Sequence, residues 1–494
     1  MNIAMETGTL VSLGLYFVLM LLIGIYAQRR STGDSEGYLL AGRNLSPTVA
    51  ALSAGASDMS GWLLLGLPGA LYISGLVEVW IGIGLFVGAF INWIIVAPRL
   101  REQTERYGNA LTIPQFLANR FPEQALALRV ASAVVIVLFF TVYTAAGLVG
   151  GGKLFATSFA GLFAGADIAP YAAGLWVTAG VVVAYTVIGG FLAVSLTDFV
   201  QGLIMLAALV LMPLVVMFGE GGRAGASLFE VQPGFLSLTQ GLTALSFLSA
   251  VSWGIGYFGQ PHIIVRFMAI RSLPEVATAR WIGMAWMAIC LAGAIGVGLA
   301  GRAYVERSSL TLEDPETIFI LLAETLFHPL VTGFLLAALL AAIMSTISSQ
   351  LLVSSSSLTE DFYRLFLRRR ASEQEAVNVS RFCVLLVALA AIAIAADPDS
   401  RVLGLVANAW AGFGASFGPV ILLALTWRGM SGAGALAGLI TGTAVVAGWI
   451  ALGWNANFIG GEGLYEIIPG FLAAFAAIVI VSLATRPAAS SVPA

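Results

Sequence analysis

The stretch ALSAGASDMSGW, residues 51–62, decides the fold, because it places one carboxylate inside an otherwise uncharged part of the chain. Asp58 is the only Asp, Glu, Lys or Arg between Asn44 and Val77. Moving a carboxylate to the centre of a bilayer costs about 2.5 to 3.5 kcal/mol on insertion scales. We therefore expect Asp58 to face protein, water or an ion, and we treat it as a candidate functional residue.

The backbone around Asp58 is also expected to be irregular. Gly55 and Gly61 bracket it, and serines fill several of the positions between and beside them. Weak helix formers at this density predict a membrane helix that is locally unwound. Broken helices at membrane depth expose main-chain carbonyl oxygens, and transporters bind ions and substrates at such breaks.

The composition indicates an all-α polytopic membrane protein. The chain has 494 residues, of which 59% are hydrophobic and 10% charged, and its mean hydropathy is +0.95. The sequence contains thirteen uncharged runs, if Asp58 is allowed inside one of these runs. Most of the runs reach the roughly 20 residues that a membrane-spanning helix needs. The run 382–396 reaches that length only with its flanks. The thirteen runs are 7–28, 44–77, 79–98, 130–152, 168–197, 199–219, 231–265, 281–301, 325–359, 382–396, 402–427, 429–461 and 467–485.

The basic residues predict the orientation of these thirteen helices. With the N-terminus outside, 18 of the 23 Lys and Arg residues fall in cytoplasmic segments. Membrane proteins keep an excess of Lys and Arg on the cytoplasmic side. We therefore expect the N-terminus outside and the C-terminus in the cytoplasm. The five residues expected outside are Lys153, Arg223, Arg302, Arg307 and Arg401.

Several function classes are excluded by composition. A net charge of −3 argues against nucleic acid as a partner, since the basic loops are explained by topology. Two cysteines in or beside apolar runs do not indicate a disulfide framework. His262 and His328 are the only histidines, and no clustered metal or nucleophile set accompanies them. We therefore do not expect an enzyme.

A second interrupted span contains SWGIGYFGQPH, residues 252–262. Its glycine spacing matches a dinucleotide-binding fingerprint, but no strand precedes it, so that match carries no function. The glycines and Pro261 are expected to break the helix. Trp253 and Tyr257, four residues apart, share a face that can hold an apolar or cationic group. A kinked packing helix is the alternative.

A third element lies in the run 325–359. The hydroxyls of Ser345 and Thr346 can bond to the preceding turn, which is common for hydroxyls in membrane helices. Alternatively they face the broken span around Asp58 and complete a set of five neutral oxygens. Such a set suits Na⁺ better than Mg²⁺ or Ca²⁺, which favour carboxylates in direct contact. The five oxygens would be the carbonyls of Ala56, Met59 and Ala342 and the hydroxyls of Ser345 and Thr346.

Three further residues each allow two interpretations. Tyr143 combines a ring and a hydroxyl, so it can wall a substrate pocket or be an ordinary core tyrosine. Arg43 is a topology signal or an inner charge near an ion exit. Asp198 opens an apolar run, which favours an N-terminal helix cap or, second, a place on an ion path. The acidic segment 302–324 is expected to be a solvated outer rim.

Several of these motifs closely resemble the sodium:solute symporter family, and the similarity extends over nearly the whole chain. The motifs are long and specific, unlike the glycine fingerprint. The residues that carry the resemblance are 54–62, 253–262 and 342–346, with further similarity at 189–195, 408–414 and 464–470.

The resemblance implies a single integral membrane domain built around two inverted five-helix repeats. The first repeat would hold the second to sixth helices, 44–219, and the second repeat the seventh to eleventh, 231–427. The helices 7–28 and 429–485 would be peripheral. The second and seventh helices are the ones expected to be broken.

The resemblance also implies Na⁺-driven import of L-proline by alternating access through the cell inner membrane, with no obligate protein partner. Another small amino acid or a carboxylate is the alternative substrate. The family's Na⁺ site carries over onto Ala56, Met59, Ala342, Ser345 and Thr346, with Asp58 also needed. Its proline pocket carries over onto Ser60, Gly61, Tyr143, Trp253, Tyr257 and Pro261.

Overall fold

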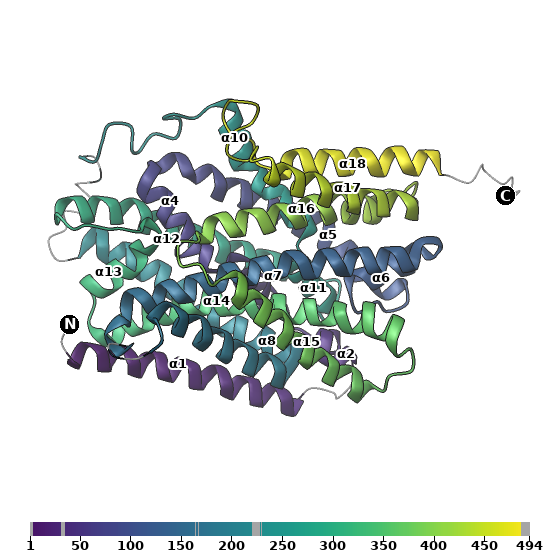
Figure 1. The fold of residues 1–494 in the computed structure, drawn as a ribbon, viewed down its shortest axis with the longest axis horizontal. Coiled ribbons are helices and arrows are strands. Elements are labelled where there is room, and N and C mark those ends of the chain that lie inside the picture. Colours follow the sequence, from purple (N-terminus) through teal and green to yellow (C-terminus); the bar gives the residue numbers. More distant parts are fainter. Residues whose placement is uncertain are drawn as a thin grey trace, which may run out of the picture.

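The computed structural model describes residues 3–30, 35–163, 165, 167–219, 228 and 230–485. Arg223 and Arg486, two of the residues counted for orientation, lie outside this part of the chain. In the described ranges the elements are helices, and ten helical stretches are long and apolar enough to cross a membrane. The long helices run side by side along the longest axis, with α1 at one edge and α17 and α18 at the opposite edge (Figure 1). The predicted class, an all-helical polytopic membrane protein, is confirmed.

The first part of the chain forms eight α-helices, the last of which is the long helix α8. These are α1 (Ile3–Arg30), α2 (Ser35–Leu40), α3 (Pro47–Met59), α4 (Gly66–Ser74), α5 (Val79–Arg106), α6 (Ile113–Arg120), α7 (Ala125–Ser158) and α8 (Pro170–Phe218). Short 3₁₀ segments lie between them at η1 (Ala41–Arg43), η2 (Gly61–Leu63), η3 (Gly75–Glu78), η4 (Pro122–Gln124) and η5 (Ala160–Phe163).

The second part begins with a broken element and ends with two antiparallel neighbours. Its α-helices are α10 (Ala244–Val251), α11 (Pro261–Ala269), α12 (Glu275–Arg307), α13 (Ile318–Leu326), α14 (Pro329–Leu358), α15 (Glu373–Ile394), α16 (Val402–Thr426), α17 (Gly432–Ala451) and α18 (Ile467–Ala484). The other helical segments are η6 (Ser252–Gly259), η7 (Pro315–Thr317) and the π-helical η8 (Thr359–Leu367).

The break near Asp58 is confirmed. Helix α3 starts with Ser46 as its N-cap and Pro47 in its first turn. Proline is tolerated in the first turn because a backbone N–H at that position has no acceptor within the helix. It ends at Met59, because Ser60 adopts φ 44° and ψ −172°, which no helix continues. The chain then passes through η2 into α4. One irregular joint therefore divides this span into two helices.

The second predicted break is also present. Helix α10 runs into the 3₁₀ segment η6, and Gln260 is extended at ψ 101° before Pro261 starts α11. A residue before proline is biased to extended backbone, so the sequence itself enforces this corner. The start of α3 and the end of α11 meet at an isolated bridge between Leu45 and Ile270.

Helix α8 differs from the sequence expectation. Its 49 residues include Gly190, whose φ 59° and ψ −152° are not helical, so the element consists of two arms. A Cβ at Gly190 would lie 2.6 Å from Tyr38, so both the backbone angle and the close approach require glycine. The break was expected at Asp198, between the runs 168–197 and 199–219. Asp198 instead lies inside the second arm, so its interpretation as an N-terminal cap is wrong.

Helix α14 lies at the centre of the bundle. It packs against α1, α3, α7 and α8, and its serine-rich inner part is buried. Helix α3 also contacts α8 and α12, while η6 packs between α5 and α16. Helices α1 and α18 expose large apolar side chains such as Leu15, Leu22, Leu472 and Ile480. Such faces are expected where a helix meets lipid.

The expected outer rim is not simply solvated. Lys153 lies near the end of α7 and is buried, and its ammonium group is 2.7 Å from Asp314 and 2.7 Å from Glu316. Glu316 also accepts the backbone N–H groups of Val402 at 3.1 Å and Leu403 at 3.0 Å. Its carboxylate therefore caps the start of α16, where the helix dipole favours a negative charge. The prediction of a solvated acidic segment is wrong for Glu316.

Candidate functional site

The junction of α3 and α14 gathers main-chain and hydroxyl oxygens. The Ser345 hydroxyl donates to the carbonyl of Ala56 at 2.7 Å and lies 3.1 Å from the carbonyl of Ala342. The Thr346 hydroxyl donates to the same Ala342 carbonyl at 3.2 Å. Met59, whose carbonyl was the fifth predicted oxygen, is the last residue of α3 and is buried. Ser345 therefore bonds both to its own turn and to the neighbouring helix, whereas Thr346 bonds to its own turn. Whether the five oxygens form an ion site stays a prediction.

The chemistry of these oxygens fits a hard cation of low charge. Carbonyl and hydroxyl oxygens are neutral, so they can replace the water around a monovalent ion without strongly favouring a divalent one. Within the described ranges there is no group of three or more His, Cys, Asp or Glu residues that could hold a metal ion. The donor set at this junction is therefore compatible with Na⁺.

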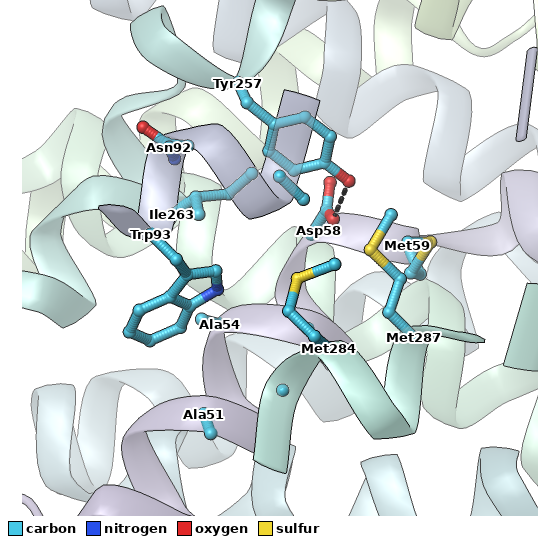
Figure 2. A pocket seen from close by; sticks show the side chains of 13 residues that line it. Ala51, Ala54, Asp58, Met59, Asn92, Trp93, Tyr257, Ile263, Met284 and Met287 are labelled. Carbon is cyan, nitrogen blue, oxygen red and sulfur yellow. Dashed lines mark hydrogen bonds between the residues drawn. The ribbon is translucent and has the colours of Figure 1, made fainter. Parts of the chain in front are cut away.

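Asp58 connects the two broken elements. It lies in the last turn of α3, is 7% exposed, and accepts a hydrogen bond from the hydroxyl of Tyr257 in η6. Figure 2 shows the two side chains pointing toward one another, with Met284 and Met287 of α12 on the other side of the carboxylate. The apolar surroundings make this hydrogen bond the main compensation for burying the carboxylate.

Four of the predicted substrate residues line one cavity beside Asp58. These are Ser60, Tyr143, Trp253 and Tyr257. Gly61 is buried in η2 next to them but is not part of the lining, and Pro261 borders a different cavity. Their assignment to the substrate pocket stays a prediction. The cavity measures only about 10 Å³, roughly the space of one water-sized probe, so its walls lie close together.

The same cavity has walls that were not assigned from the sequence. Trp62 stacks on Trp253 with ring centroids 6.0 Å apart, and Trp410 meets Tyr257 edge-on at 5.0 Å. The Trp410 ring also donates to the carbonyl of Trp253 at 2.8 Å. Both tryptophans lie in the quoted motifs 54–62 and 408–414, but spacing alone does not show that they face one pocket. Leu85 and Val406 complete the lining that was missed.

Asp198, a candidate for an ion path, forms an ion pair in the core of the bundle. Its carboxylate is 3.1 Å from the guanidinium of Arg266, and both side chains are at most 1% exposed. The hydroxyl of Ser53 donates to Asp198 at 2.7 Å, and Arg266 donates to Ser53 at 3.2 Å and to Ser349. Ser349 donates in turn to the carbonyl of Ser345 at 2.8 Å. This network joins α3, α8, α11 and α14, and the bond from Ser349 to Ser345 connects it to the oxygen cluster.

Sequence reasoning missed the role of Arg266. It was counted only as a cytoplasmic charge, because it follows directly after the uncharged run 231–265. In the structure it is part of α11 and is one of the largest fully buried side chains. A buried arginine needs a carboxylate partner, so the isolated Asp198 was the available signal.

Arg43, the other candidate for an ion path, has a different environment. Its guanidinium donates to Asn109 at 2.8 Å, Thr104 at 3.2 Å, Met268 at 2.8 Å and Ala110 at 2.7 Å. These contacts fasten the segment before α3 to the ends of α5 and α11. The structure therefore places Arg43 at the joint of the two broken elements and does not bring it together with the oxygen cluster.

Comparison with known proteins agrees with this architecture. The family model "Sodium:solute symporter family" matches residues 38–442. The high-affinity proline transporter PutP of Bacillus subtilis (strain 168) is 53% identical over 475 residues, covering 96% of this chain and 97% of the relative. The osmoregulated proline transporter OpuE of the same organism is 50% identical over 490 residues, covering 99% and 97%. A sodium/proline symporter of Staphylococcus aureus (strain JH9) is 50% identical over 487 residues, covering 97% and 93%.

Solved structures support the fold alone, since their sequences are distant. A Na⁺-coupled sialic acid symporter in a substrate-bound outward-open state gives a TM-score of 0.79 at 18% identity, covering 97% of this chain and 98% of that one. MHP1, a nucleobase-cation-symport-1 family transporter in a closed conformation, gives 0.53 at 15% identity, covering 94% and 97%. With the family match over most of its length, the chain belongs to the sodium:solute symporter family.

Proposed function

We propose that this protein imports L-proline across the cell inner membrane together with Na⁺, by alternating access. The observation that carries the proposal is the 2.7 Å contact between the Ser345 hydroxyl and the Ala56 carbonyl, where α14 meets the break in α3. The names of the relatives, which are proline transporters and sodium/proline symporters, support the choice of substrate. The second candidate substrate class is another small amino acid or a carboxylate.

The helix arrangement proposed here has thirteen membrane-spanning helices, with the N-terminus outside. The two arms of α8 count separately, and each broken element counts once. On this count the first repeat runs through 44–219 and the second through 231–427. Each begins with its broken element, and α1, α17 and α18 lie outside the repeats. Inverted repeats with discontinuous first helices are a known architecture of secondary transporters.

The Na⁺ site proposed here consists of the oxygens of Ala56, Met59, Ala342, Ser345 and Thr346. Support comes from the hydrogen bonds that hold Ser345 and Thr346 against these carbonyls. Na⁺ at this point would attach α14 to α3, because both helices contribute ligands. Asp58 lies two residues from Ala56 and holds Tyr257, so the same ligation would steady the substrate pocket.

The substrate pocket proposed here lies between the two breaks. The proline ring would pack against Tyr143, Trp253 and Tyr257, whose rings supply apolar faces. The buried indole N–H of Trp62 has no hydrogen-bond partner among the described residues, so it is available to the substrate carboxylate. Ser60 and Gly61, with Pro261, shape the backbone at the two breaks. Because the cavity is narrow, proline must move these side chains apart.

The driving force is sufficient for accumulation. Moving one charge across about 100 mV yields about 2.3 kcal/mol. A roughly tenfold Na⁺ gradient adds about 1.4 kcal/mol. Since each 1.4 kcal/mol corresponds to a factor of ten, one Na⁺ per proline supports accumulation of several hundredfold.

The function is tested by uptake of labelled L-proline into proteoliposomes under an inward Na⁺ gradient. We expect uptake above equilibrium that collapses when the gradient is dissipated. Equal uptake with a proton gradient and no Na⁺ would reject Na⁺ as the coupling ion. A competition panel of other amino acids and small carboxylates separates the two substrate classes, since only the true class suppresses uptake.

Replacing Tyr257 with phenylalanine should lower the rate of proline uptake about tenfold or more. The change removes the hydroxyl that donates to Asp58 and leaves a buried carboxylate short of a donor. Losing a hydrogen bond to a charged group costs about 1.5 to 3 kcal/mol. The initial rate at fixed Na⁺ and the half-saturating proline concentration are the measurements.

The matched control is Tyr171→Phe, which also removes one hydroxyl. That hydroxyl donates to the neutral carbonyls of Ala395 at 2.8 Å and Asp397 at 3.3 Å, and Tyr171 does not line the pocket. We expect that variant to transport at nearly the unaltered rate. Equal losses in both variants would show that the effect of Tyr257 is general and not tied to Asp58.

A further inference from the structure

Arg280 is a cation at the edge of the membrane that lacks a carboxylate partner. It lies in the second turn of α12, directly before the uncharged run 281–301. Its Nε atom is buried without a hydrogen-bond partner, and no described residue forms an ion pair with its guanidinium. By contrast, Arg129 and Arg266 contact carboxylates at 2.8 Å and 3.1 Å. A charged group in this position is costly unless something outside the described chain compensates it.

The neighbouring helix α5 shows how deep Arg280 lies. The ring of Trp281 contacts that of Phe90, with centroids 5.7 Å apart. Phe90 is inside the uncharged run 79–98, and the first charge after it is Arg99. A helix rises 1.5 Å per residue, so these two positions are about 13 Å apart along α5. Arg280 therefore begins its side chain beside an apolar part of α5 and not beside the charged end of that helix.

The surface next to Arg280 is apolar and faces away from the bundle. Trp281 is 61% exposed, and the α5 residues Val87 and Ile94 are exposed as well. The guanidinium of Arg280 lies over the Trp281 ring, 5.4 Å from its centroid. Exposed tryptophans are typical of the boundary between hydrocarbon and headgroups, and arginines near it extend toward the headgroups. This pair of side chains therefore marks a place where a lipid headgroup meets the protein.

We propose that Arg280 and Trp281 bind the phosphate group of an anionic phospholipid on the lipid-facing surface of α5 and α12. A guanidinium can donate two parallel hydrogen bonds to phosphate oxygens, which would supply the acceptor that Nε lacks. Charge complementarity favours an anionic headgroup over a zwitterionic one, because Arg280 has no neutralising partner among the described residues. The carboxylate nearest to it along α12, Glu275, is already bonded to Arg271.

Helix α12 connects this lipid site with the interior of the protein. Met284 follows Arg280 by one helical turn and lines the cavity beside Asp58, as Figure 2 shows. The helix also lies tightly against α3, since a Cβ at Gly55 would be 2.7 Å from the ring of Trp286. A lipid bound at Arg280 would therefore restrain a helix that borders the proposed ion and substrate sites. The lipid site itself does not depend on which substrate is transported.

The test is quenching of tryptophan fluorescence by brominated lipids in vesicles of phosphatidylcholine that contain a small fraction of phosphatidylglycerol. The chain has 11 tryptophans, so the signal of Trp281 is the difference between each protein and its Trp281→Phe form. At equal mole fraction, we expect brominated phosphatidylglycerol to be enriched about fivefold over brominated phosphatidylcholine at Trp281, the order expected for one arginine near a membrane surface.

Variants of two arginines separate a specific site from general attraction. Arg280→Gln should lose the preference for phosphatidylglycerol, and Arg280→Lys should keep part of it, because lysine retains the charge without the paired donors. Arg271→Gln is the matched control, since it removes the same charge from an exposed side chain that already pairs with Glu275. That control should keep the whole preference.

The rate of Na⁺-driven proline uptake gives a second readout. In the unaltered protein the initial rate should rise when phosphatidylglycerol replaces part of the phosphatidylcholine. In Arg280→Gln this rise should be absent, whereas Arg271→Gln should respond like the unaltered protein. An equal rise in Arg280→Gln would show that anionic lipid acts on transport at another place.

Three results of the fluorescence measurement would overturn the lipid site. Equal quenching of Trp281 by the two brominated lipids would show that the surface does not select an anionic headgroup. Equal losses in Arg280→Gln and Arg271→Gln would show a general effect of surface charge. Displacement by inorganic phosphate, but not by sodium chloride of the same ionic strength, would assign the site to free phosphate. Absent uptake in the unaltered protein with the lipid preference intact would instead contradict the proposed function.

Discussion

Replacing Ser345 and Thr346 together with alanine should raise the Na⁺ concentration needed for half-maximal proline uptake by about 10- to 100-fold. Each substitution removes one neutral oxygen from the cluster at the α3–α14 junction. A hydrogen-bonding or ligating group of this kind contributes about 1 kcal/mol net, and two of them correspond to this range. At saturating Na⁺ the half-saturating proline concentration should change far less, because neither residue lines the substrate pocket.

The control for this prediction is Ser356→Ala on the same helix. The Ser356 hydroxyl bonds only within its own turn, to the carbonyl of Val353 at 2.8 Å. Its loss should leave the Na⁺ dependence unaltered, while expression and folding report any general effect of removing a hydroxyl from α14. An unchanged Na⁺ requirement in the double variant would remove the cluster from consideration as the ion site.

The breaks in the fold were predictable because their causes are local. Ser60 follows Asp58 in a stretch of weak helix formers, and Pro261 forces an extended residue before it, so nearby sequence determines both irregular joints. The expected face of Tyr257 was also local, since it depends on a four-residue spacing from Trp253. That these two breaks form one site followed from the family resemblance and not from spacing.

The break in α8 and the environment of Lys153 were not predictable, because long-range packing determines them. The uncharged runs suggested a boundary at Asp198, whereas the chain bends at Gly190, where Tyr38 from a distant segment approaches. Lys153 looked like a loop residue because a charge ended an apolar run. Its partner Glu316 lies 163 positions later, and only the folded bundle brings them together.

The same limit applies to the cavity walls. Trp62 and Trp410 were visible in the sequence as members of distinctive motifs. Nothing in their spacing indicates that they line one pocket, because η2 and α16 become neighbours only through packing. The uncharged runs predict the helices, and the glycine, serine and proline residues predict the breaks. The contacts between helices can be seen only in the tertiary structure.

The buried pair of Asp198 and Arg266 should dominate the stability of the inner half of the bundle. We expect Asp198→Asn alone to lower the free energy of unfolding by about 3 to 5 kcal/mol, because it leaves Arg266 as an uncompensated buried charge. Arg266 also donates to Ser53 and Ser349, so a disturbed guanidinium would loosen α3 and α14 together. The measurement is denaturant unfolding of the purified protein in mixed micelles, followed by near-ultraviolet circular dichroism.

The double variant Asp198→Asn with Arg266→Gln distinguishes the cost of an unpaired buried charge from the cost of disturbed packing. Removing both charges should restore a large part of the stability lost in Asp198→Asn, since replacing a whole buried pair by neutral groups is often tolerated. Glu275→Gln, which breaks the exposed pair with Arg271, should change stability little, because solvent screens that interaction. If the double variant is less stable than either single variant, each residue stabilises the bundle through contacts outside the pair, such as their bonds to Ser53 and Ser349. If Asp198→Asn unfolds at the same denaturant concentration as the unaltered protein, Asp198 does not compensate Arg266, and the network does not hold the four helices together.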